Sequence, residues 1–260
     1  MPHIDPHRRS LLAGLAGLPL AALLADPVLA QAAAQATRSQ TITTAGGREA
    51  TAAVARPDSV ADVHVPVVLL VHEWWGLNDQ IKAVAVELSR QGFLAVAVDL
   101  FQGRVVTTAD EARALVEKVN PQEASDILSS WAAWARNHPD GNRKVGVVGW
   151  CFGGGWALRA ATLAPLDACV VYYGRADLSA DQLGRLRGPV LGHFARHDTF
   201  ITADVVAAFE RGMKQAGKPF TLYWYDAGHA FANPTGDNYR KPEAQQAWSR
   251  TLDFLRRELA

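Results

Sequence analysis

The segment Gly149–Leu158, GWCFGGGWAL, places one of the two cysteines of the chain among glycines. Gly149, Cys151 and Gly153 have the spacing of a nucleophile between two glycines, which is typical of a sharp turn from a strand into a helix. Larger side chains two residues before or after Cys151 would collide with the adjoining backbone. Such a turn directs the sulfur out over the edge of a sheet, and the start of the helix favours a thiolate. We therefore predict that Cys151 is a nucleophile.

Two structural alternatives exist for Cys151. It could be a buried cysteine in a glycine-rich turn, since free cysteine is often buried. It could also form a disulfide with Cys169, which begins the next predicted strand. About four residues of strand would separate the two sulfurs by about 13 Å, whereas a disulfide needs Cα atoms within about 7 Å. Cys169 is therefore predicted to be a core residue.

A thiol nucleophile needs a base, and the base needs an orienting acid. Asp198 follows the predicted strand Pro189–Phe194, and His229 follows the predicted strand Phe220–Tyr225. The order nucleophile, acid, histidine is the one expected for loops after successive parallel strands. We predict that His229 is the base and Asp198 its partner. The turn also directs the Phe152 N–H to where an oxyanion would form.

Other residues compete for these roles. His197 adjoins Asp198 and could act as the base, and Asp226 could orient His229 instead of Asp198. His193 lies inside a predicted strand, where a hydrogen-bonded core histidine is the simpler interpretation. His193 and His197 would have metal-ligand spacing only on a helix, so no metal site is predicted.

Alternating strands and helices predict the architecture that would position these residues. Apolar runs of strand length alternate with helical patterns, which indicates a mostly parallel sheet with helices on both faces. The expected strands are Val65–His72, Phe93–Asp99, Val145–Gly149, Ala168–Tyr173, Pro189–Phe194 and Phe220–Tyr225. Thr41–Arg56, with Gly46 and Gly47 at its middle, predicts an antiparallel hairpin before them.

The composition excludes several classes of protein. The chain has 260 residues and 49% hydrophobic content, which suits one α/β domain. Lysines and arginines number 26, as do aspartates and glutamates, so no basic surface for nucleic acid or anionic membranes is indicated. Two cysteines are too few for a disulfide framework. We expect a monomer.

The first residues resemble a targeting segment. Arg8 and Arg9 precede the uncharged run Leu11–Leu24, which is shorter than the roughly 18 residues of a membrane span. Val28–Ala30 supplies the small residues that a signal peptidase recognises. The arginine pair resembles a twin-arginine signal, although an ordinary secretion signal is the alternative. We predict an export signal over residues 1–30, a loose leader over 31–40, a catalytic domain over 41–260 and a periplasmic location.

Four sequence motifs resemble the dienelactone hydrolase family, and the resemblance spans the chain from about residue 40 to the C-terminus. They are VHEWWGLN (Val71–Asn78), GWCFGGG (Gly149–Gly155), ARHDTFI (Ala195–Ile201) and DAGHAFAN (Asp226–Asn233). The resemblance implies an α/β-hydrolase fold, a triad of Cys151, His229 and Asp198, and no cofactor. It also implies that Glu73 contacts the resting thiol and helps convert it to thiolate. A carboxylate in an apolar pocket tends to accept a proton, which agrees with that role.

The same resemblance implies a set of binding residues. The Trp74 N–H would be the second oxyanion donor, and Arg104 would hold a substrate carboxylate. Asn233 stands where members active on dienelactone have a second arginine, so electrostatic selection for a carboxylate is weaker here. The predicted aromatic wall of the pocket consists of Trp74, Trp75, Trp150 and Phe152, for which core packing is the alternative.

These patterns predict a hydrolase that cleaves a small-molecule ester or lactone through an acyl-enzyme. A general carboxylesterase or a thioesterase on the same scaffold is the nearest alternative. A non-catalytic member whose Cys151 senses oxidants is the alternative from another class.

Overall fold

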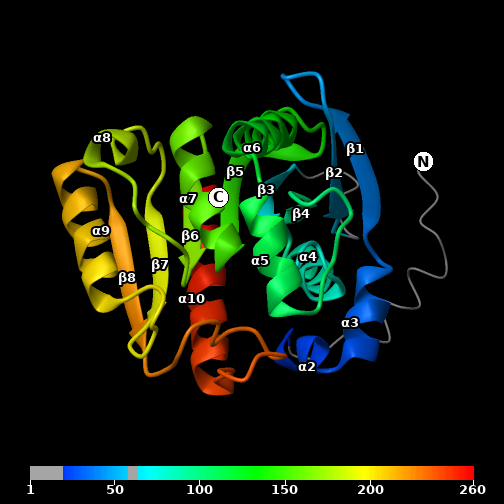
Figure 1. Ribbon diagram of the computed structural model, residues 1–260. Coiled ribbons are helices and arrows are strands. Elements are labelled where there is room, and N and C mark those ends of the chain that lie inside the picture. Colours follow the sequence, from blue (N-terminus) through cyan, green and yellow to red (C-terminus); the bar gives the residue numbers. More distant parts are fainter. Residues whose placement is uncertain (1–19, 58–63) are drawn as a thin grey trace.

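A computed structural model describes residues 20–57 and 64–260, and an eight-stranded sheet lies at the centre of this part of the chain (Figure 1). The strands follow the spatial order β1-β2-β4-β3-β5-β6-β7-β8. β1 and β2 are antiparallel, β2 is antiparallel to β4, and all remaining pairs are parallel. The predicted hairpin and the mostly parallel sheet are thus confirmed. The bounds are β1 Arg38–Thr43, β2 Glu49–Ala55, β3 Val65–Val71, β4 Leu94–Val98, β5 Gly141–Trp150, β6 Ala168–Tyr172, β7 Val190–Ala195 and β8 Phe220–Tyr225.

Helices cover both faces of the sheet because its central strands are apolar on both sides. In β3, for example, Val67, Leu69 and Val71 pack on one face, and Val68 and Leu70 on the other. The first face is covered by α5 (Ala109–Glu117), α6 (Pro121–Arg136), α7 (Phe152–Leu163), α8 (Ala180–Leu183) and α9 (Ala203–Gln215). The second is covered by α2 (Leu20–Ala25), α3 (Pro27–Ala34), α4 (Asp79–Arg90) and α10 (Lys241–Leu259).

The parallel strands end at one edge of the sheet, and the side chains that could take part in a reaction lie at this shared edge. Register pairs Val71 with Gly149 and Trp150 with Tyr172, so β3, β5 and β6 end side by side. The segments that follow β3, β5 and β6 carry Glu73, Cys151 and Tyr173, and those that follow β7 and β8 carry Asp198 and His229. A site at the carboxyl ends of the strands is the usual outcome in open α/β sheets.

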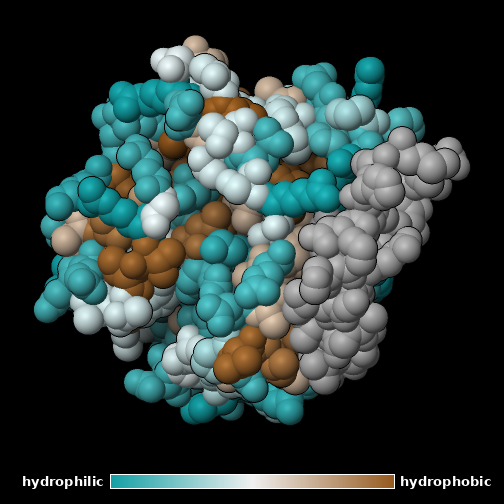
Figure 2. Space-filling view, turned by 90° about the vertical axis from the view of Figure 1, so that its right-hand side faces the viewer, coloured by the Kyte–Doolittle hydropathy of each residue, from teal (hydrophilic) through white to brown (hydrophobic). Residues whose placement is uncertain are grey.

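Polar residues protect the outer edge of the sheet at β1. Its residues Arg38, Ser39, Gln40 and Thr41 are exposed, and a polar edge discourages pairing with another chain. Figure 2, viewed from this side, shows a mainly hydrophilic surface with separate apolar patches.

The N-terminal part of the chain differs from the expectation. Residues 31–40, predicted as a loose leader, include the end of α3 and the start of β1. Ala30 and Ala33 are buried against the α4 side of the sheet, and small side chains permit this close helix packing. Arg8, Arg9 and the first part of the apolar run lie outside the described residues. No helix of 20–57 and 64–260 is long and apolar enough to cross a membrane.

Glycines at the turn after β5 let two backbone segments touch. A Cβ on Gly153 would overlap the carbonyl oxygens of Val71 and His72, at the end of the neighbouring strand β3. A Cβ on Gly149 would overlap the Gly153 carbonyl and lie 2.9 Å from the Ala157 Cβ. The predicted steric reason for both glycines is therefore present in the structure.

Gly153→Ala is expected to destabilise the fold, because the new methyl group meets rigid backbone that cannot rotate away. We expect the free energy of unfolding to fall by about 3 kcal/mol, at the upper end for overpacking, and the Tm to fall by about 10 °C. Thermal unfolding followed by circular dichroism measures this. Gly236→Ala is the matched control, since its Cβ would meet only the Asn233 oxygen at 3.5 Å. Equal Tm values for the two variants would contradict the steric argument.

Candidate active site

Cys151 occupies the tight turn between β5 and α7. Its backbone has φ 51° and ψ −117°, a conformation that non-glycine residues rarely adopt. The Cys151 N–H donates to the Tyr172 carbonyl at 3.0 Å, which ties the turn to β6. The Phe152 N–H donates to the thiol sulfur, as expected for an amide aimed at the reacting centre. Strain of this kind persists where the surrounding structure enforces it, and it occurs often at functional sites.

The structure brings the three residues of the predicted triad into one hydrogen-bonded chain. His229 Nε2 lies 3.2 Å from Cys151 Sγ, and His229 Nδ1 lies 2.7 Å from Asp198 Oδ2. The Asp198 side chain is 0% exposed, and its other oxygen accepts the N–H groups of Phe200 and Ile201. These bonds fix the carboxylate, so the imidazole is held with Nε2 facing the sulfur.

The competing residues lie elsewhere. His197 pairs with Asp226 on the surface at 2.6 Å, where their side chains are 68% and 81% exposed. His193 is fully buried and bonds to the hydroxyls of Tyr225 at 2.8 Å and Thr251 at 3.0 Å. Burial lowers the pKa of His193 to about 3, so it is a neutral core residue, as predicted. Neither His197 nor Asp226 is hydrogen-bonded to His229 or Cys151 among the described residues.

Glu73 lies just beyond the end of β3 and is almost completely buried. Its oxygens accept the Asn233 side-chain amide at 2.5 Å and the Tyr173 hydroxyl at 3.3 Å. Burial raises the pKa of Glu73 to about 7, although the bond from Asn233, the charge of His229 and the bond from Tyr173 act in the opposite direction. Glu73 is therefore close to half-protonated near neutral pH.

The resting thiol is protonated. Burial is the main reason that the pKa of Cys151 rises to about 12, and the charges of Glu73 and Asp198 add to it. The bond from the Phe152 amide lowers the pKa but does not outweigh them. Desolvation and two carboxylates therefore outweigh the predicted preference of the helix start for a thiolate in the resting site.

Cys169 forms no disulfide with Cys151. Both cysteines are free, and Cys169 is buried in β6 opposite Val147. This agrees with its predicted place in the core.

The predicted aromatic wall divides between the two faces of the sheet. Trp150 is 7% exposed, stacks on Tyr172 and packs among α4 and α10, whereas Phe152 packs on the opposite face near Phe101. Trp150 therefore does not share a pocket with Phe152, because the turn at Cys151 sends the side chains before and after it to opposite faces. Trp74 and Trp75 are half-buried and contact each other edge to face at 5.0 Å. The oxyanion role of the Trp74 N–H stays a prediction.

Asn233 and Arg104 stand where the family resemblance implies binding of a substrate carboxylate, but the two side chains lie in different surroundings. Asn233 is 8% exposed and donates to Glu73, so it holds a carboxylate of the protein itself. Arg104 is exposed and lines a cavity of about 230 Å³ together with Lys118 and Asn120. Within the described residues, no group of three or more histidines, cysteines or acidic residues is arranged to hold a metal.

Sequence reasoning missed the residues that hold Glu73. His72 Nδ1 lies 2.6 Å from the Glu73 carbonyl oxygen, and His72 Nε2 accepts the Leu100 N–H at 3.1 Å. Burial lowers the pKa of His72, so the neutral ring donates on one side and accepts on the other. Tyr173 contacts both Glu73 and the His229 ring, at a centroid distance of 5.3 Å. Their positions immediately after strands β3 and β6 were the only signal in the sequence.

A cysteine in a strand-turn-helix bend, hydrogen-bonded to a histidine and an acid that follow later strands, is the arrangement expected of an α/β-hydrolase. Residues 50–259 match the model of the dienelactone hydrolase family, and the chain belongs to this family. It is therefore a carboxylic ester hydrolase of the type that cleaves esters and lactones.

Similar proteins agree with this assignment. A carboxymethylenebutenolidase of a Pseudomonas species is 31% identical over 74% of this chain and 84% of its own length. A carboxymethylenebutenolidase of Pseudomonas putida is 29% identical over 76% of this chain and 88% of its own. A dienelactone hydrolase-like promiscuous phosphotriesterase from metagenomic libraries superposes with a TM-score of 0.78, at 20% identity, over 86% of this chain and 100% of its own, which shows the shared fold.

Glu73→Gln is expected to lower the pKa of Cys151, because it removes a negative charge that disfavours the thiolate. We expect the midpoint of iodoacetamide alkylation against pH to fall by about one unit. Mass spectrometry identifies the labelled cysteine, and Cys169 should stay unlabelled because burial raises its pKa strongly. Glu87→Gln is the matched control, a buried glutamate paired with Arg90 on α4. An unchanged or higher midpoint in Glu73→Gln would contradict the electrostatic account.

Proposed function

We propose that the protein hydrolyses esters or lactones through a triad of Cys151, His229 and Asp198 and a covalent acyl-enzyme. The observation that carries the proposal is the 3.2 Å distance between His229 Nε2 and Cys151 Sγ, with Asp198 on the other ring nitrogen. Nδ1–H donates to Asp198, which leaves Nε2 free to take the thiol proton.

In the first half of the reaction, His229 accepts the proton of the Cys151 thiol as the sulfur attacks the substrate carbonyl carbon. The Phe152 N–H, already directed at the sulfur, stabilises the oxyanion. We assign the second oxyanion donor to the Trp74 N–H. The carbon–oxygen bond then breaks, the alkoxide takes the proton from His229, and a thioester on Cys151 remains.

In the second half, His229 removes a proton from water as the water attacks the thioester. The carbon–sulfur bond breaks, the thiolate recovers the proton, and the carboxylic acid product leaves. The site returns to the neutral thiol that the pKa of about 12 favours at rest. No cofactor takes part in this scheme.

Glu73 controls the charge of the thiol in this proposal. An ionised Glu73 opposes the thiolate, whereas a protonated Glu73 does not, and its pKa of about 7 allows either state near neutral pH. A group with such a pKa is suited to proton exchange during turnover. We propose that substrate binding shifts this balance towards the thiolate.

The substrate class that fits is a small ester or lactone that does not depend on a carboxylate for recognition. Asn233, in the position of the second arginine, is occupied by Glu73, and Arg104 is exposed. The Pseudomonas relatives carry the name carboxymethylenebutenolidase, so the corresponding dienelactone is one compound to test. Aryl esters and acyl thioesters represent the carboxylesterase and thioesterase alternatives.

Cys151→Ala and His229→Ala are expected to lose at least about a thousandfold in kcat/KM on whichever of these compounds the wild type cleaves. Steady-state rates on dienelactone, aryl esters and thioesters measure this, and circular dichroism confirms the fold. Cys169→Ala and His197→Ala are matched controls that should keep nearly full activity, because these side chains lie in the core and on the surface. Cys151→Ser should retain slow turnover, since an alcohol needs more help from its base than a thiol.

Unchanged rates in Cys151→Ala or His229→Ala would remove that residue from the mechanism. Peroxide oxidation of Cys151 without turnover of any of the compounds would instead support the redox-sensing alternative.

We also propose that residues 1–30 direct export to the periplasm, through the arginine pair Arg8–Arg9. The support is the sequence pattern of arginines, apolar run and small residues. Mass spectrometry of the fractionated protein should find a periplasmic form that begins at Gln31, or at Gln35 if cleavage follows Ala34. Changing both arginines to lysine should retain the uncleaved chain in the cytoplasm. A full-length chain found only in the cytoplasm of the wild type would contradict export.

A further inference from the structure

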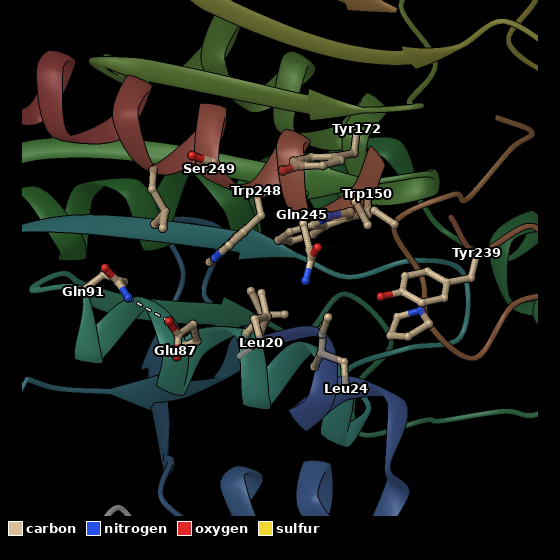
Figure 3. Close-up of a pocket in the computed structure, with 16 residues that line it drawn as sticks. Leu20, Leu24, Glu87, Gln91, Trp150, Tyr172, Tyr239, Gln245, Trp248 and Ser249 are labelled. Atoms are coloured by element: carbon tan, nitrogen blue, oxygen red, sulfur yellow. Dashed lines mark hydrogen bonds between the residues drawn. The ribbon is translucent and has the colours of Figure 1, made fainter. Parts of the chain in front are cut away.

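A second cavity lies on the face of the sheet away from Phe152, between α2, α4, α10 and the loop after His229 (Figure 3). Its volume is about 380 Å³. Trp150, Tyr172, Trp248, Leu24 and Leu252 form much of its wall. Cys151, His229 and Asp198 do not line it, so this cavity is separate from the triad.

The wall of the cavity is mainly apolar and contains a few polar groups. Tyr239 lines the cavity, and Figure 3 shows its hydroxyl turned toward the other lining side chains. That hydroxyl oxygen is buried and has no hydrogen-bond partner within residues 20–57 and 64–260. Since an unpaired buried hydroxyl costs free energy, a ligand oxygen that accepts from Tyr239 would be favoured.

The charges of the cavity wall disfavour an acidic ligand. Glu87 is the only charged residue in the described wall, and its carboxylate is paired with Arg90 and Gln91. No basic side chain of the described residues lines the cavity that could neutralise a bound carboxylate. Gln245 and Ser249 supply neutral polar groups beside Trp248 on α10. A neutral ligand with one hydroxyl or carbonyl oxygen therefore fits better than a fatty acid.

The volume limits the size of the ligand. At about 30 Å³ for each water-sized atom, the cavity of about 380 Å³ holds about a dozen heavy atoms. Cavities of this size and apolar character are typical of small-molecule sites. We propose that in the uncleaved chain, where Leu20 and Leu24 of α2 close the wall, this cavity binds a neutral, medium-chain aliphatic alcohol or ester, with the chain against Trp150 and Trp248 and the oxygen on the Tyr239 hydroxyl.

The test is isothermal titration calorimetry of the full chain with 1-octanol and with octanoate. We expect one molecule of octanol to bind per chain, and octanoate to bind at least about tenfold more weakly, because no basic side chain of the described wall neutralises its carboxylate. Cys151→Ala should bind octanol like the wild type, which separates this site from the triad. Tyr239→Phe should weaken octanol binding about three- to tenfold, the usual effect of one lost hydrogen bond. Tyr223→Phe, outside the cavity, should not.

Filling the cavity supplies the decisive control. Ala244→Phe places a ring in the cavity and should abolish octanol binding, whereas Gln246→Phe, on the same helix but outside the lining, should leave it intact. If Ala244→Phe fails to fold by circular dichroism, Ser249→Leu fills the space from the same helix. Absence of binding in the wild type, or undiminished binding in the folded cavity-filling variant, would overturn the proposal.

Discussion

The contact between Cys151 and His229 depends on the close approach of the turn after β5 to the end of β3. Gly153 touches the Val71 and His72 carbonyls, and no side chain would fit between these backbones. This approach forces the positive φ of Cys151 and directs its sulfur to the sheet edge where His229 arrives from the end of β8. Backbone contacts hold the turn against the sheet edge, and the bond to Asp198 holds the imidazole with Nε2 facing the sulfur.

The electrostatic surroundings of Cys151 act against an ionised thiol. Burial and the nearby carboxylates of Glu73 and Asp198 keep the Cys151 proton in place, and the Phe152 amide opposes them only in part. Glu73 is itself destabilised as an anion, although the Asn233 amide and the Tyr173 hydroxyl moderate this. The site therefore contains two weak acids, Glu73 and Cys151, and burial in an apolar space disfavours the ionised form of both. A neutral thiol at rest is also less reactive towards oxidants than a thiolate.

The residues on either side of Cys151 connect it to both faces of the sheet. Phe152 packs against Phe101 on one face, and Trp150 stacks on Tyr172 on the other. Trp150 therefore belongs both to the turn after β5 and to the wall of the cavity between α4 and α10. The part of α2 that closes this cavity belongs to the segment predicted to be cleaved. Processing would thus change the wall of this cavity while leaving the triad residues intact.

Local patterns in the sequence were enough to predict the parallel sheet, the hairpin and the strand-end positions of Cys151, Asp198 and His229. Apolar runs of strand length and glycines around a turn are local signals, and parallel strands necessarily end at one edge. Only the tertiary structure decided that Asn233 binds Glu73, that Trp150 points away from Phe152, and that burial and two carboxylates raise the pKa of Cys151. These features depend on side-chain direction, burial and charges from residues far apart in the chain, whose combined effect arises only when the strands and helices pack together.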